Sequence, residues 1–192
     1  IQTDYYEPQK SLLHPAVKDK DFFTFVRDPI DHFLSGWAEA AVRQFETDKN
    51  QNESLELQVL DKASYDKTIK AFVKEMNSLT YGVSNIEMID QSHAFPQANF
   101  MVDDNGEIDP RIKVVGDMHE MLKVLEVIGF NDTNKHKEKG RDASMDEMKQ
   151  KYFPARKDWL SDETLIEICD FVAVDYYLFD FVSPEACLLR TA

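Results

Sequence analysis

The stretch from residue 22 to residue 37 constrains the fold of this chain more than any other part of its sequence. Residues 22–26 are apolar or β-branched and predict a buried strand, which Arg27 follows directly. An Asp-Pro pair at 28–29 then stops the strand, because proline lacks the amide that a strand would use. Apolar residues next recur at the spacing of a helix, at Ile30, Phe33, Leu34 and Trp37. The stretch therefore predicts a strand that turns directly into a helix.

The predicted turn places Arg27 at the carboxyl end of a strand, beside the exposed amides of a helix N-terminus. The fixed cation and the helix dipole both stabilise an anion at such a place. Ser35 lies about two turns into the helix, near the face that carries Asp28 and Asp31, and its hydroxyl can reach toward the same ligand. The pattern alone favours the alternative of a solvated arginine at a sheet edge, because strand-to-helix turns with an arginine are common, and both interpretations stay open.

The same residues resemble a known motif. The run Phe25-Val26-Arg27-Asp28-Pro29, followed by Phe33-Leu34-Ser35-Gly36-Trp37, resembles the 3′-phosphate-binding motif of the carbohydrate sulfotransferases. In that family the arginine and serine of an Arg-Asp-Pro-x-x-Arg-x-x-Ser-x-Tyr pattern hold the 3′-phosphate of 3′-phosphoadenosine 5′-phosphosulfate (PAPS). The resemblance implies this role for Arg27 and Ser35. His32 stands where the second arginine is usual, and Trp37 replaces the tyrosine.

A second segment, His93-Ala94-Phe95-Pro96-Gln97, is similar to a His-aromatic-Pro-Gln segment of the same family. It makes His93 the candidate catalytic residue, because a neutral imidazole accepts a hydroxyl proton near neutral pH. The alternative is a histidine that only anchors a loop through hydrogen bonds. In the family a cysteine tends to follow this segment, whereas this chain has Phe100 and Met101.

The charge of the chain is strongly acidic but uneven. A formal net charge of -14 argues against general binding to nucleic acid, because the mean field repels polyanions. Residues 135–157 nevertheless carry eight basic and four acidic side chains, a local net charge of +4. Such a segment is either a place for an anionic ligand or a solvated surface. In sulfotransferases the corresponding region often closes over the nucleotide, which implies phosphate contacts by Lys135, Lys137, Lys139 and Arg141.

The rest of the sequence predicts an alternation of helices and strands. The helix after Pro29 should run to the mid-forties, and the charged, Asn-rich residues 46–56 predict a surface loop. Strands are expected at 98–102 and 112–115. Further helices are expected to begin at Ser64, Asp117, Ser144 and Ser161, each residue acting as a cap or standing in the first turn.

The cysteine content is low. Cys169 and Cys187 make neither a disulfide framework nor a metal site. Cys169 lies on an apolar helix face and fits a small buried hydrophobic residue. Whether the two cysteines pair is left open by the sequence.

The resemblance extends over residues 20–181, after an irregular lead-in at 1–20, and implies one domain over 1–192. The implied fold is α/β, a three-layer parallel sheet flanked by helices and related to P-loop nucleotide-binding folds. It is expected to be incomplete at its N-terminus, because the family's 5′-phosphosulfate loop, a Pro-Lys-x-Gly-x-Thr type segment, is not found in this sequence. A sheet that lacks a strand exposes its edges, so the chain is expected to pair either with a second copy, as a homo-oligomer, or with a missing segment.

The implied activity is transfer of a sulfuryl group from PAPS, as co-substrate and without a metal, to a hydroxyl of a carbohydrate acceptor. The alternative is a non-catalytic, sulfotransferase-like binding or interaction domain that lacks the 5′-phosphosulfate loop. The resemblance places the protein in the Golgi lumen as a single-pass type II membrane glycoprotein. The anchor would precede Ile1, where this chain begins.

Overall fold

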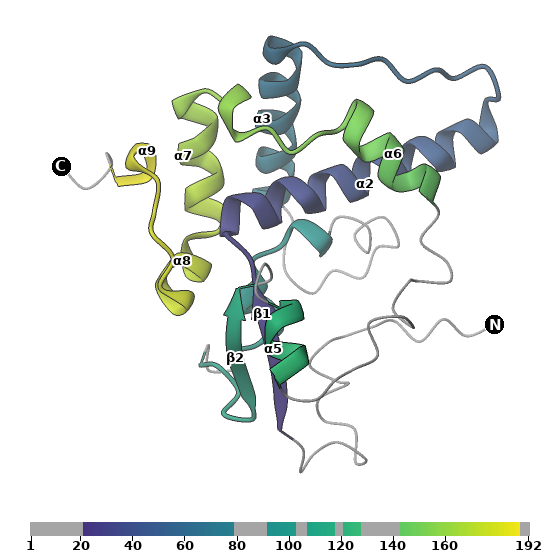
Figure 1. Ribbon diagram of the computed structural model, residues 1–192. Helices are drawn as coiled ribbons and strands as arrows, with labels where there is room; N and C mark the ends of the chain where they lie inside the picture. Colours follow the sequence, from purple (N-terminus) through teal and green to yellow (C-terminus); the bar gives the residue numbers. More distant parts are fainter. Residues whose placement is uncertain (1–20, 79–91, 103–106, 118–120, 128–142, 189–192) are drawn as a thin grey trace. The chain divides into compact units, whose positions relative to one another are not determined.

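The computed structural model describes residues 21–78, 92–102, 107–117, 121–127 and 143–188 (Figure 1). Over these ranges the chain contains helices and a parallel two-stranded sheet, so the α/β class expected from the sequence is confirmed at this level. Contacts divide the chain into two compact units. The first falls within Ile1–Arg27 and Gln97–Asn131, and the second within Asp28–Pro96 and Asp132–Ala192.

The first unit is built on the parallel pair of β1 (Phe22–Val26) and β2 (Ile112–Asp117). Two of the three predicted strands, at 22–26 and 112–115, are therefore confirmed, and β2 runs two residues further than expected. The register shifts after Thr24, and Gly116 next to the shift has a φ of 156°, a conformation that favours glycine. Because Asp117 pairs with Val26, it is a strand residue and not the expected helix cap. The helix α5 (Met121–Val127) contacts β2.

The strand expected at 98–102 is wrong. Residues Gln97–Phe100 form a 3₁₀ helix, η2, and the described residues around it show extended pairing only in one antiparallel bridge, between Val102 and Ile108. The amides of Met101 and Val102 both donate to the carbonyl of Ala98, at 2.8 and 3.0 Å. These local hydrogen bonds take the place of the bonds that a strand would make to a neighbour.

The second unit is organised around the long helix α2 (Pro29–Gln51). It begins as predicted, with Asp28 as N-cap accepting a hydrogen bond from the amide of Asp31 at 3.0 Å. The expected apolar face is buried, at Ile30, Phe33, Leu34 and Trp37. The loop expected from residue 46 begins only at Asn52, because the polar end of α2 is supported by side-chain bonds one turn apart, such as Gln44 to Asp48 at 2.9 Å.

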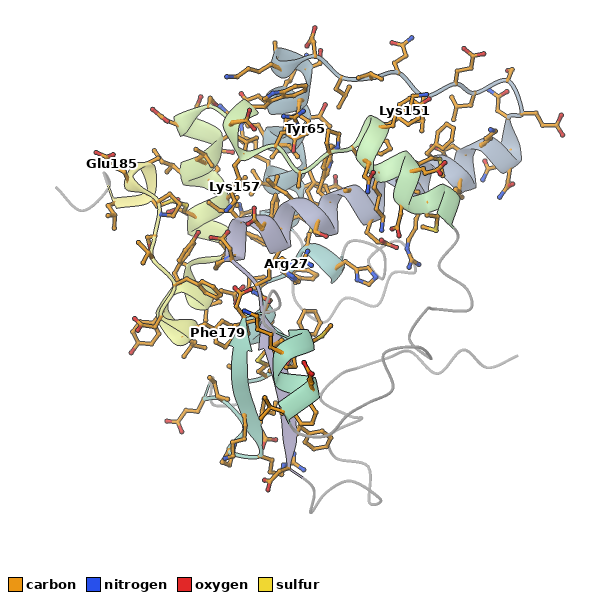
Figure 2. All side chains as sticks on the ribbon, viewed as in Figure 1. Arg27, Tyr65, Lys151, Lys157, Phe179 and Glu185 are labelled. Carbon is orange, nitrogen blue, oxygen red and sulfur yellow. A yellow bond between two sulfur atoms is a disulfide. The ribbon has the colours of Figure 1, made fainter. Side chains whose placement is uncertain are left out.

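Around α2 pack α3 (Lys62–Ser78), α6 (Ala143–Tyr152) and α7 (Asp162–Phe171), all expected from the sequence (Figure 1). Tyr65, labelled on α3 in Figure 2, is completely buried. Its ring meets the rings of Trp37 and Trp159 edge to face, and its hydroxyl accepts from the amide of Arg156 at 3.1 Å. Trp37 is thus a core residue, as expected from its place on the apolar face of the helix.

Two helix caps were predicted in α3 and α7, and one is confirmed. Ser161 accepts a hydrogen bond from the amide of Thr164 at 3.3 Å and caps α7 as expected. At α3 the capping side chain is Asp61 rather than Ser64, because the Asp61 carboxylate accepts from the amide of Ser64 at 2.8 Å. Aspartate is as strong a cap as serine, so the cap of α3 lies at Asp61, three residues before the predicted cap Ser64.

The C-terminal part of the second unit is joined by a disulfide. The short helices η4 (Lys157–Trp159), α8 (Ala173–Phe179) and α9 (Glu185–Leu188) flank α7 in sequence. Cys169 on α7 and Cys187 on α9 form the bond, with Cα atoms 5.9 Å apart. The structure therefore answers the question that the sequence left open. In the described ranges no helix has the length and hydropathy needed to cross a membrane, and no cluster of three metal-ligating side chains is found.

Candidate functional site

A cavity of about 300 Å³ lies in the second unit, between α2, α6 and the short helix η1 (Ser92–Ala94). It contains two residues that the sequence singled out, Ser35 and His93, which come from separate motifs. The described residues that line it are His32, Ser35, Gly36, Glu39, Arg43, His93, Met145 and Lys149.

The lining residues of α2 form one stripe along the helix. Their spacing from His32 is three, four, seven and eleven residues, which returns to the same face at every turn. This face lies opposite the buried apolar face of the helix. The local pattern therefore separates the helix into a side that packs and a side that presents polar groups to the cavity.

His93 is positioned by close contact between η1 and α2. A Cβ atom on Gly36 would lie 2.3 Å from the carbonyl oxygen of His93 and 2.4 Å from the amide nitrogen of Ala94. Only a glycine allows the two backbones to approach so closely. His32 adds a second tie, since its Nε2 donates to the carbonyl of Phe95 at 3.1 Å. His32, at the position of the family's second arginine, thus holds the His93 segment, and the His93 side chain is exposed where it lines the cavity.

Replacing Gly36 with alanine is expected to lower the free energy of unfolding by about 1–2 kcal/mol. Alanine alone would stabilise a helix by up to about 1 kcal/mol relative to glycine, but overpacking against the η1 backbone costs about 1–3 kcal/mol. Urea unfolding measures the effect. Ala41→Gly on the same helix is the control for helix propensity, and a Gly36→Ala protein more stable than the wild type would contradict the contact.

Three charged side chains that line the cavity form a network. Glu39 is ion-paired with Lys149 of α6 and accepts from Nε of Arg43 at 2.8 Å. The Glu39 and Lys149 side chains are only 14% and 19% exposed. Burial raises the pKa of Glu39, but the hydrogen bonds from Lys149 and Arg43 outweigh it, so this pKa lies below its ordinary value. Two cations and one carboxylate leave this network with a net positive charge.

Replacing Glu39 with glutamine is expected to lower the free energy of unfolding by about 1 kcal/mol at neutral pH, because Lys149 loses a charged acceptor. The pKa of Glu39 is lower in the folded chain than the ordinary 4.5, so its contribution is complete above that pH and is lost as the pH falls through the folded value. Wild type and variant should converge in acid. Urea titrations at several pH values test this, with the exposed Glu56→Gln as control, and a difference that stays constant with pH would argue against the ion pair.

Arg27 is held by its backbone in the first unit. Its N–H donates to Oε1 of Gln97, and its carbonyl accepts from Nε2 of the same side chain, both at 2.8 Å. Gln97 is 7% exposed. Because Arg27 belongs to the first unit and Ser35 to the second, their joint binding of a phosphate stays a prediction. Lys135, Lys137, Lys139 and Arg141 lie outside the described residues.

The first turn of α2, where the sequence suggested an anion, is occupied by acidic side chains of the protein. Lys157, labelled in Figure 2, lies 2.8 Å from Asp28 and 3.0 Å from Asp31. Burial lowers the pKa of Lys157, but its hydrogen bonds to the two carboxylates outweigh this and raise it. Asp28 also binds the amide of Asp31. The polar face that is open to a ligand is therefore further along α2, at the cavity.

Sequence reasoning missed Glu39, Arg43 and Lys149. The signal for the first two was present, because they follow Ser35 at intervals of four residues and so share its helix face. Lys149 belongs to the basic segment, but only packing of α6 against α2 brings it to Glu39.

No protein-family model, no curated protein sequence and no solved structure is detectably similar to this chain. A function is therefore proposed from the two motifs and from the cavity.

Proposed function

We propose that this chain transfers a sulfuryl group from PAPS to a hydroxyl of a carbohydrate, with the cavity on α2 as the reacting site. The observation that supports this most is that Ser35 and His93, taken from two motifs of the same enzyme family, line one cavity together with Arg43 and Lys149. We further propose that β1 and β2 belong to a sulfotransferase-type parallel sheet.

The side chains of the cavity suit the proposed substrate. A hydroxyl, a guanidinium, an ammonium and imidazole groups are donors that recognise phosphate and sulfate oxygens. A volume of about 300 Å³ is at the lower end for ligand sites, so the cavity suits the phosphosulfate end and an acceptor hydroxyl better than a complete nucleotide. Arg27 and the cations at 135–141 remain the proposed contacts for the rest of the nucleotide.

The proposed step is an in-line transfer. The acceptor oxygen forms a bond to sulfur while the bond from sulfur to the 5′-phosphate oxygen breaks, and the hydroxyl proton passes to the His93 imidazole. Arg43 and Lys149 stabilise the negative charge that develops on the leaving 5′-phosphate. In this proposal Ser35 donates a hydrogen bond to the same 5′-phosphate, and not to the 3′-phosphate that the resemblance implied for it. Sulfuryl transfer resembles phosphoryl transfer in needing mainly position and charge.

A second candidate is nucleotide binding without transfer. It is favoured by Glu39, which already engages both Lys149 and Arg43 and so weakens their attraction for a ligand. The two proposals agree on the ligand and differ in the chemistry.

The compartment follows from the same reasoning. The Cys169–Cys187 disulfide is typical of an oxidising environment. It supports a place in the secretory pathway, and we propose the Golgi lumen with a glycan as acceptor.

Transfer of radiolabelled sulfate from PAPS to a panel of glycans tests the activity, and calorimetry with 3′,5′-adenosine diphosphate tests binding. Arg27→Ala is expected to weaken binding roughly 10- to 100-fold, and Ser35→Ala about 5-fold, from the loss of charged and neutral hydrogen bonds respectively. Ser64→Ala on α3 is the control and should bind normally. Transfer together with binding supports the enzyme. Binding without transfer supports the second candidate, and a folded protein that does neither would exclude both.

A further inference from the structure

The segment directly after α2 has the sequence of an N-glycosylation acceptor, Asn52-Glu53-Ser54. All three residues are exposed. Asn52 is the C-cap of α2 and has extended backbone angles, φ -141° and ψ 93°, so it lies outside the helix. The connection that follows runs from the end of α2 to α3 at the edge of the second unit (Figure 1). An attached sugar there would meet solvent rather than the core.

The two side chains that the acceptor pattern requires are in contact. The side-chain carbonyl oxygen of Asn52 accepts from the hydroxyl of Ser54 at 2.7 Å and from its amide at 3.2 Å. These bonds span only two residues, so the turn can form without the rest of the fold. The hydroxyl polarises the amide that would become the attachment point.

The cysteines give independent support for the compartment. Both cysteines of the chain are joined in the Cys169–Cys187 disulfide, and no free cysteine remains. Disulfides form in oxidising compartments, and one of these, the endoplasmic reticulum, is also where N-glycans are attached. This support does not depend on the proposed sulfuryl transfer.

We propose that Asn52 carries an N-linked glycan. The donor is an oligosaccharide linked to a lipid pyrophosphate, and the host's transferase catalyses the step. The amide nitrogen of Asn52 forms a bond to C1 of the first sugar, and the bond from C1 to the pyrophosphate oxygen breaks. The amide loses one proton to a base of the transferase, and the lipid pyrophosphate leaves with the bonding electrons.

The test is expression of the chain behind a secretory signal in eukaryotic cells, read from total cell protein. Asn131-Asp132-Thr133 is a second acceptor sequence, in a part of the chain that the structure does not describe, so every variant carries Asn131→Gln. We expect an electrophoretic shift that peptide N-glycosidase removes. The enzyme converts the modified asparagine to aspartate, which peptide mass spectrometry should locate at position 52.

Four further variants decide the outcome. Adding Asn52→Gln or Ser54→Ala should abolish the shift, whereas Ser54→Thr and Glu53→Gln should keep it. Absence of the glycan in the Asn131→Gln protein, while its disulfide forms, overturns the proposal. A shift that survives Ser54→Ala also overturns it. Sulfuryl transfer by the Asn52→Gln protein should match that of its parent, so the failure of this proposal and the failure of the enzymatic one give different results.

Discussion

Replacing Cys169 and Cys187 together with alanine is expected to lower the free energy of unfolding by about 3 kcal/mol. The disulfide joins residues with a sequence separation of 18 and so lowers the conformational entropy of the unfolded chain. Removing the disulfide restores that entropy and stabilises the unfolded state. The same loss should appear as a fall in melting temperature on the order of 10 °C for a chain of this size. Urea unfolding with and without reductant measures it.

Reductant supplies the control for this prediction. It should destabilise the wild type to the level of the double variant and leave the double variant unchanged. An oxidised wild type whose unfolding midpoint does not respond to reductant, although thiol titration shows both cysteines released, would mean that the link between α7 and α9 contributes nothing.

If His93 is the general base of the proposed sulfuryl transfer, replacing it with alanine is expected to reduce the rate of that transfer by a factor of 10²–10⁴, the usual contribution of a general base. The segment that carries His93 is held by the close approach of its backbone to Gly36 and by the His32 bond to Phe95, and His93→Ala keeps both of these contacts. The variant should therefore fold normally. Steady-state kinetics with PAPS should show the loss in kcat, with KM for PAPS little changed.

Two comparisons make the His93 result specific. Lys74→Ala, an exposed change on α3, should keep full activity. Calorimetry should show that His93→Ala still binds 3′,5′-adenosine diphosphate. If His93→Ala turns over at the wild-type rate, the residue is a loop anchor and the base lies elsewhere.

The elements that the sequence predicted well are those with a long, regular pattern. The turn from β1 into α2, and helices α3, α6 and α7, follow from apolar spacing and local caps. The prediction of a strand at 98–102 was wrong because amides in this segment donate hydrogen bonds within their own turn. The apolar content of the segment does not reveal such local hydrogen bonds. The predicted end of α2 was wrong for a similar reason. Polar residues are typical of loops, but polar side chains one turn apart also bond to one another and stabilise a helix.

The candidate site was predictable only residue by residue. Ser35 and His93 were found from motifs, but their meeting in one cavity depends on Gly36, whose importance is steric and leaves no chemical signature in the sequence. The Lys149 contact depends on how α6 packs on α2, a tertiary relation between residues far apart in the chain. Periodicity identifies which face of a helix is apolar, but it does not identify the element that packs against that face.

The Gln97 side chain has a consequence for experiments on Arg27. By accepting from the N–H of Arg27 and donating to its carbonyl, it makes the pair of bonds that a neighbouring strand would make at one residue. Neither bond uses the guanidinium. Arg27→Lys or Arg27→Ala therefore changes the side chain at position 27 while both backbone hydrogen bonds to Gln97 remain. Gln97→Ala removes these two hydrogen bonds and leaves the guanidinium in place. The position of the backbone at residue 27 thus depends on the side chain of Gln97, whereas the charge there depends on the side chain of Arg27. The two properties can be changed separately by mutation.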